Sequence, residues 1–231
     1  MIQPTTSLAS VQQDFVSSAS KLFIFFGGIQ GQVGMAPFEF YRSSDILDCS
    51  RLFLRDLSQS WYQRGLPGIG NDAFAIGRFL DERIAASGAA DICFVGNSMG
   101  GYAALLFCAM MGRGRVVAFA PQTFISKAAR MRHGDARWAR QIETLHAARQ
   151  AGAIEELRPW ILDRCPKIQA DIYVSRRDRL DLAHAQELAD LQNCNVHFEE
   201  GGVHNLVRQL RDDGKLARIL TDNALAHNAP D

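Results

Sequence analysis

The stretch DICFVGNSMGGYAALLFCAMMG, residues 91–112, joins a short apolar run to a pattern of small residues with helical spacing. The run DICFV lacks strict alternation and is typical of a strand covered on both faces. Ser98 lies at the junction, with Gly96 two residues before it and Gly100 two residues after it. A sharp strand-to-helix turn needs small residues at those two positions, and it exposes the serine hydroxyl. The stretch therefore indicates either a nucleophile on a tight turn or, more simply, a loop of glycine and serine.

Similar β-rich runs recur along the chain and alternate with amphipathic segments. Predicted strands cover residues 21–26, 51–55, 91–95, 115–120, 170–175 and 195–200, and predicted helices cover 71–86, 99–111, 180–191 and 205–220. Such alternation predicts an α/β fold, with a mostly parallel central sheet and helices on both faces. We expect one domain over residues 1–231. The first twenty residues fit either an added edge strand or a lead-in.

Residues 123–167 interrupt this rhythm, because they show helical patterns and no strand. Gly134, Gly152 and Pro159 are expected to divide the interval into three short helices. It is too long for a crossover, so we interpret it as a helical cap inserted over one end of the sheet. Its cations either attract an anionic substrate or an acidic carrier, or simply form a solvated helix face. Within residues 127–140 they are Lys127, Arg130, Arg132, Arg137 and Arg140, against Asp135 alone.

Composition excludes several classes of protein. The 231 residues are 47% hydrophobic, and 25 basic residues balance 25 acidic ones, which argues against a general nucleic-acid binder. No apolar run approaches the roughly 18 residues of a membrane span, and no secretory signal is visible. The five cysteines are scattered and odd in number, which favours free thiols and a cytoplasmic location over disulfides or a zinc site.

The pentapeptide GNSMG at residues 96–100, in its strand–turn–helix context, resembles the nucleophile elbow of the α/β-hydrolase superfamily. The resemblance implies that an acid and a histidine follow Ser98, each after its own strand. His204 follows the predicted strand 195–200, and Asp178 and Asp181 follow the strand 170–175. We favour Asp178 as the acid, because it lies sooner after its strand, and expect Asp181 to cap the next helix. The other histidines are expected to be structural: His133, His146, His184, His197 and His227.

Two backbone amides are expected to bind an oxyanion. The first is the Met99 N–H, at the start of the helix after Ser98. By the resemblance, the second comes from the glycine-rich loop after strand 21–26, where we favour Gly28 over Ile29. This loop lacks the G-x-G-x-x-G spacing of a dinucleotide site. Ile29, Asp56, Trp61 and Tyr62 are candidate substrate-binding residues, and the last three are expected at the same rim, where they either line a substrate pocket or pack the loop.

The resemblance implies acyl-transfer chemistry through an acyl-enzyme at Ser98, with water releasing the acyl group. An esterase or thioesterase acting on a small-molecule acyl substrate, free or carrier-bound, is the leading expectation. No metal or organic cofactor is implied. An acyltransferase on the same scaffold is one alternative. A hydrolase-like binding protein without chemistry is the other, and the set Ser98, Asp178 and His204 argues against it.

Overall fold

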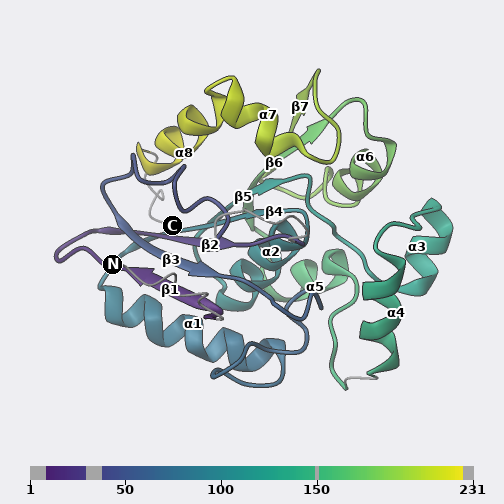
Figure 1. Ribbon diagram of the computed structural model, residues 1–231, viewed down its shortest axis with the longest axis horizontal. Helices are drawn as coiled ribbons and strands as arrows, with labels where there is room; N and C mark the ends of the chain where they lie inside the picture. Colours follow the sequence, from purple (N-terminus) through teal and green to yellow (C-terminus); the bar gives the residue numbers. More distant parts are fainter. Residues whose placement is uncertain (1–8, 30–37, 149–150, 226–231) are drawn as a thin grey trace, which may run out of the picture.

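The sheet at the centre of the computed structural model has seven strands in the order β1-β3-β2-β4-β5-β6-β7 (Figure 1). The structure describes residues 9–29, 38–148 and 151–225. All neighbouring strands are parallel except β1, which pairs antiparallel with β3 at one edge. The strands are β1 (Val11–Asp14), β2 (Lys21–Phe26), β3 (Ser50–Leu54), β4 (Asp91–Asn97), β5 (Arg115–Phe119), β6 (Gln169–Ser175) and β7 (Cys194–Glu199).

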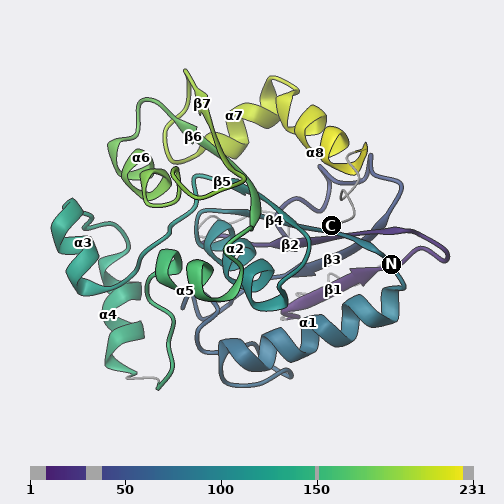
Figure 2. The ribbon, with the colours of Figure 1, turned by 180° about the vertical axis from the view of Figure 1, so that it is seen from behind.

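Helices cover both faces of this sheet, which confirms the predicted fold class. Figures 1 and 2 show α7 and α8 on the opposite side of the sheet from α1. In β2, Phe23 and Phe25 pack toward α7 and α8, whereas Leu22 and Ile24 join the larger core with α1 and α2. The helices are α1 (Ala73–Ser87), α2 (Met99–Met111), α3 (Lys127–His133), α4 (Ala139–Ala147), α5 (Leu157–Arg164), α6 (Arg179–Gln186), α7 (Leu206–Asp212) and α8 (Lys215–Leu225).

At the junction of β4 and α2, the positions of Gly96 and Gly100 leave no room for a side chain. A Cβ on Gly96 would lie 2.0 Å from the carbonyl oxygen of Gly100, and one on Gly100 would lie 2.1 Å from that of Phe26. Atoms at those distances overlap, so only glycine allows α2 to begin directly over the ends of β2 and β4. This contact fixes Ser98, which lies between the two glycines, at the carboxyl end of the sheet.

The described part of the insertion between β5 and β6 holds three helices, as predicted, but their boundaries and packing differ from one another. Gly134 ends α3 with a φ of 63°, whereas Pro159 lies inside the first turn of α5, where a missing N–H is tolerated, and divides nothing. Helix α5 packs through Leu157 and Ile161 into the core beside α2. We therefore use "cap segment" for α3, α4 and the loop between them, residues 127–147, which lie at one end of the molecule (Figure 1).

The last predicted helix is instead two helices. Gly214 takes a left-handed conformation, with a φ of 74°, between α7 and α8. That conformation interrupts the helix at a point where the amphipathic pattern continues. Within residues 9–29, 38–148 and 151–225, no helix combines the length and the apolarity needed to cross a bilayer.

Candidate active site

Ser98 occupies a strained backbone conformation between β4 and α2. Its φ of 56° and ψ of −117° lie in a region that side-chain-bearing residues rarely adopt. The surrounding backbone holds it there: the Ser98 N–H donates to the Phe119 carbonyl at 2.9 Å, and its carbonyl accepts from Tyr102 N–H at 3.0 Å and from Gln122 N–H at 3.3 Å. The turn places Ser98 at the carboxyl end of the sheet, but the residue is buried, with 5% of its surface exposed, whereas an exposed hydroxyl was expected.

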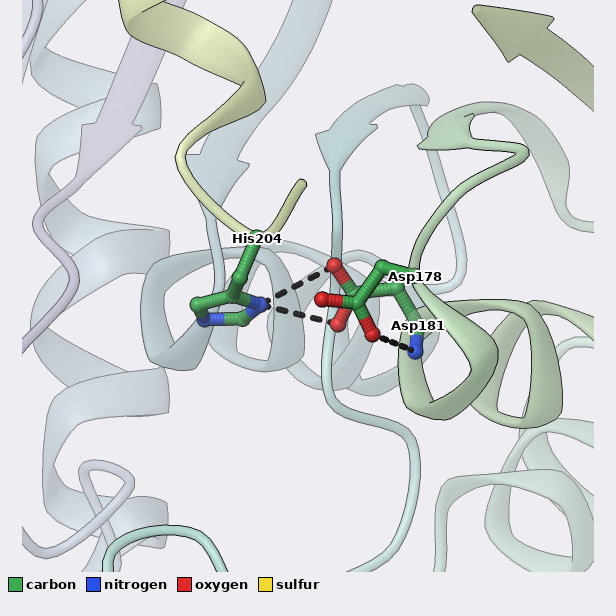
Figure 3. Close-up of side chains that lie close together, drawn as sticks. All are labelled: Asp178, Asp181 and His204. Carbon is green, nitrogen blue, oxygen red and sulfur yellow. Dashed lines mark hydrogen bonds and ion pairs between the residues drawn. The ribbon is translucent and has the colours of Figure 1, made fainter. Parts of the chain in front are cut away.

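His204 meets Ser98 from the loop between β7 and α7. Its Nε2 lies 2.8 Å from Ser98 Oγ. On the other side of the ring, its Nδ1 lies 2.8 Å and 3.1 Å from the two carboxylate oxygens of Asp181, a contact shown in Figure 3. A carboxylate only accepts hydrogen bonds, so Nδ1 carries the imidazole proton and Nε2 accepts from the serine hydroxyl. Ser98, His204 and Asp181 thus form a continuous chain of hydrogen bonds from a hydroxyl through an imidazole to a carboxylate.

The two aspartates exchange the positions expected of them. Asp178 is the N-cap of α6, and its Oδ1 accepts from the backbone N–H groups of Leu180 and Asp181 at 3.0 Å each. Asp181 lies in the first turn of α6, is fully buried, and contacts His204. The expectation that Asp178 contacts His204 is therefore wrong, because Asp181 makes that contact instead. The reason is that the residue directly before the helix is used to satisfy the free amides of its first turn.

Arg137 of the cap segment also contacts the acid and the base. Its Nη1 lies 2.7 Å from Asp181 Oδ1 and 3.2 Å from His204 Nδ1, while its Nε and Nη2 lie 3.2 Å and 3.3 Å from the carboxylate of Asp135. Burial opposes the charge, but the hydrogen bonds with both carboxylates raise the pKa of Arg137. No sequence pattern distinguishes Arg137 from the other cations of the cap segment, because its contacts depend on how the cap segment packs.

One cluster among the described residues has the spacing of a metal site: Asp178, Asp181 and His204. The Nη1 of Arg137 lies within hydrogen-bond or ion-pair distance of a ligand atom of each, the longest being 3.8 Å to Asp178 Oδ1. The cationic guanidinium therefore stands where a metal ion would compete with it, so these residues do not fit a metal in this arrangement.

A buried histidine and aspartate lie behind Arg137. His184 Nδ1 accepts from the Thr123 N–H at 3.0 Å, so its Nε2 carries the proton and donates to Asp135 Oδ2 at 3.1 Å. Burial lowers the pKa of His184 and favours this neutral form. Burial acts in the opposite direction on Asp135, but hydrogen bonds from His184 and Arg137 outweigh it and hold the pKa of Asp135 well below its usual value.

The remaining histidines lie away from Ser98. His197 on β7 contacts Asp171, His146 lies near Glu155, and His133 lies near Glu187. His227 is outside the described residues. These placements agree with the structural roles expected for His133, His146 and His197.

The loop after β2 is held by a carboxylate that the sequence reasoning missed. Glu39 Oε2 accepts the Gly28 N–H at 2.8 Å, and Oε1 accepts from the Asn97 side chain at 2.9 Å. Burial raises the pKa of Glu39, although both hydrogen bonds oppose the shift. The Gly28 amide thus already has an acceptor, which contradicts its expected role as a free oxyanion donor. The signal for Glu39 was its place between two phenylalanines, in the run Phe38-Glu39-Phe40.

Three residues expected at the substrate rim instead hold the loop after β3. The Asp56 carboxylate accepts from the N–H groups of Ser60 and Tyr62 at 2.7 Å and 2.9 Å. Trp61 is fully buried and donates from Nε1 to Gln122 at 2.6 Å. The Tyr62 hydroxyl is also buried and lies 3.0 Å from the Gly27 carbonyl oxygen. The packing interpretation of Asp56, Trp61 and Tyr62 therefore holds, and the pocket interpretation does not.

Comparisons with known proteins place this geometry in a wider context. No family model matches the chain, and no curated protein matches its sequence. Solved structures do match. An α/β-hydrolase enzyme from a deep-sea metagenome library, MGS-M2, superposes with a TM-score of 0.63 over 95% of each chain at 14% identity. The chain has the α/β-hydrolase fold.

Two further solved structures match over most of their length. The capsule O-acetyltransferase of Neisseria meningitidis serogroup A has a TM-score of 0.64 over 93% of each chain, at 14% identity. MenH from S. aureus has a TM-score of 0.59 at 14% identity, and the match covers 95% of this chain and 100% of that one. The α/β-hydrolase fold is thus shared over nearly the whole length, with little sequence in common.

Proposed function

We propose that the chain is a serine hydrolase that cleaves an ester or thioester through an acyl-enzyme. The observation that carries the proposal is the contact of 2.8 Å between Ser98 Oγ and His204 Nε2, with Asp181 on the other ring nitrogen. A serine hydroxyl is a weak nucleophile unless a base removes its proton, and His204 is placed to do so. The elbow at Ser98 leaves the hydroxyl clear of its own backbone.

The reaction follows from these positions. Ser98 Oγ attacks the acyl carbonyl as His204 Nε2 takes its proton, and Asp181 stabilises the resulting imidazolium. The imidazolium then protonates the leaving alcohol or thiol, which leaves an acyl group on Ser98. Water attacks that ester, His204 again takes the proton, and the free acid departs. We assign the oxyanion to the N–H of Met99 and, since Gly28 is occupied, to the N–H of Ile29.

A second candidate function is acyl transfer to a hydroxyl-bearing acceptor at the same site. It is favoured by the likeness to the structures of the meningococcal capsule O-acetyltransferase, one of which is a variant in complex with CoA. In this reaction an acceptor hydroxyl replaces water in the second step. The donor would then be a small-molecule or carrier-bound acyl thioester. A binding protein without chemistry does not need a base within hydrogen-bond distance of Ser98.

The test is covalent labelling with an uncharged fluorophosphonate, followed by mass spectrometry of the modified peptide. We expect wild type to be modified at Ser98, the Ser98→Ala variant to show no modification at that position, and the His204→Ala variant to react at least about 10³-fold more slowly. A wild-type protein that is not modified at Ser98 would contradict the proposal. Thioester turnover with and without added alcohols then separates hydrolysis from transfer, because a transferase gives mainly the new ester, whereas a hydrolase in water gives mainly the free acid.

A further inference from the structure

The acid of the proposed triad is shared between the histidine and a residue from the cap segment. We infer that Arg137 is a positioning residue that orients Asp181 and makes the reactivity of Ser98 depend on the docked cap. The inference rests on the proposed function of Ser98, His204 and Asp181. It adds a residue from the insertion, which supplies none of Ser98, His204 and Asp181.

The shape of the guanidinium suits it to this task. Its Nε and Nη2 edge faces Asp135, at 3.2 Å and 3.3 Å, and its Nη1 reaches Asp181 Oδ1 at 2.7 Å. An arginine remains charged and offers several donors in a rigid plane, so one group spans two carboxylates with fixed geometry. Because Arg137 Nη1 fixes Oδ1, the Asp181 carboxylate cannot rotate freely against the His204 ring.

Arg137 is in turn held from behind. The backbone N–H of Arg137 donates to Asp135 Oδ1 at 2.9 Å. Asp135 Oδ2 accepts from His184 Nε2, and His184 Nδ1 accepts from the backbone N–H of Thr123. Asp135, Asp181 and His184 are all fully or almost fully buried. A continuous chain of buried hydrogen bonds thus runs from the loop after β5, through the cap segment, to the proposed base. Such networks fix the positions of their members as a unit.

Loss of Arg137 would leave Asp181 buried with His204 as its remaining side-chain partner among the hydrogen bonds described above. The carboxylate would then be free to turn, and the imidazole would lose the orientation that directs Nε2 at Ser98. Misplacement of a reacting group by about 1 Å costs up to about 10²-fold in rate. We therefore expect the chemical step to slow while binding of the substrate changes little.

The experiment compares the Ser98 labelling rates of wild type, Arg137→Met and Arg140→Met, using an uncharged fluorophosphonate. Arg140 is the matched control, since it lies exposed on α4 of the same segment. We expect Arg137→Met to be about 10²-fold slower, and Arg140→Met to match wild type. With an ester substrate, kcat should fall and KM should stay within about threefold. Loss of the downfield Nδ1 proton signal of His204 in the NMR spectrum is the corresponding spectroscopic change.

The outcomes separate this inference from the proposed function. If wild type is not labelled at Ser98, the proposed function fails first. If wild type is labelled and Arg137→Met reacts at the same rate with the same proton signal, the positioning role of Arg137 is wrong. Should Arg137→Met not fold, Arg137→Lys carries the test, because one ammonium cannot span both carboxylates. A rate at least tenfold below wild type then supports the inference, and a wild-type rate contradicts it.

Discussion

Two aspartates three residues apart at the start of α6 make different contacts because of where the helix begins. Asp178 precedes the first helical residue, so its carboxylate is drawn to the free amides of Leu180 and Asp181. Asp181 is already inside the helix, where its own amide is satisfied by that cap, and its side chain is free to meet His204. The boundary of one helix therefore decides which carboxylate reaches the histidine.

This difference predicts opposite outcomes for matched substitutions. Asp181→Asn should slow labelling of Ser98 by about 10³- to 10⁴-fold, because an amide in place of the carboxylate favours the wrong imidazole tautomer. Asp178→Asn should leave both the labelling rate and the stability nearly unchanged, since asparagine is an equally good N-cap. Labelling kinetics and thermal unfolding of both variants check this. A slow Asp178→Asn with a fast Asp181→Asn would reverse the assignment.

At this scale the sequence located some contacts and missed others. The glycine spacing predicted the turn at Ser98, and the order of strands predicted that His204 meets it. The choice between Asp178 and Asp181 depends on a helix boundary that varies by one or two residues in any sequence reading. Glu39 and Arg137 reach the site from segments whose positions no local pattern encodes. Their contacts exist only once the chain has packed.

Among the elements, α2 shows most clearly how sequence sets packing. In its first turn, Gly100 lies directly against the Phe26 carbonyl at the end of β2. Just after its last residue, the C-cap Gly112 has open surroundings. Both glycines are in the same helix region, but only the first is confined by other backbone. The continuous apolar runs of the strands likewise predicted coverage on both faces, and the two cores on either side of β2 confirm it.

Replacing each of these two glycines by alanine tests that view. Gly100→Ala should destabilise the fold by about 3 kcal/mol or more, because its methyl group would overlap the β2 backbone, which cannot move aside. Gly112→Ala should cost only about 1–2 kcal/mol, the penalty of a left-handed conformation in open space. Urea unfolding of both variants gives the comparison. Equal losses would show that the close approach of α2 to β2 is not what requires glycine.

Over the whole molecule, the cap segment is joined to the rest by a buried polar network rather than by apolar contacts alone. Asp135 and Arg137 from the cap segment meet Asp181 and His184 from α6; the Asp135, Asp181 and His184 side chains are buried, and that of Arg137 is 19% exposed. From the sequence we expect an insertion with excess positive charge that faces either solvent or a substrate. Arg137 is instead turned inward, because buried acids of two different elements surround it.

The network predicts a loss of stability in mild acid. The pKa of His184 is lowered by burial, so as pH falls below about 6.5 the unfolded chain gains a proton that the folded chain does not, and the free energy of unfolding decreases. The lowered pKa of Asp135 adds an effect of the same sign in stronger acid. When the free energy of unfolding is measured with urea between pH 7 and pH 5, it should fall less with decreasing pH for His184→Gln than for wild type.

The control for that measurement lies in its pH dependence. A substitution that only removes hydrogen bonds lowers stability by the same amount at every pH, whereas removal of a titrating group brings the two curves together as the pH falls. A constant offset between wild type and His184→Gln would therefore contradict a neutral His184 in the folded protein.

The backbone bonds of Ser98 set which parts of the site can move, and how fast. Because its amide and carbonyl are bonded to β5, to α2 and to the loop after β5, the elbow relaxes only when the centre of the sheet opens. Such openings are as rare as global unfolding. Motions that admit a substrate within a catalytic cycle must then come from the periphery, on the microsecond-to-millisecond timescale of loops and small helical segments. The nucleophile is thus the stationary part of the site, and its surroundings adjust to it.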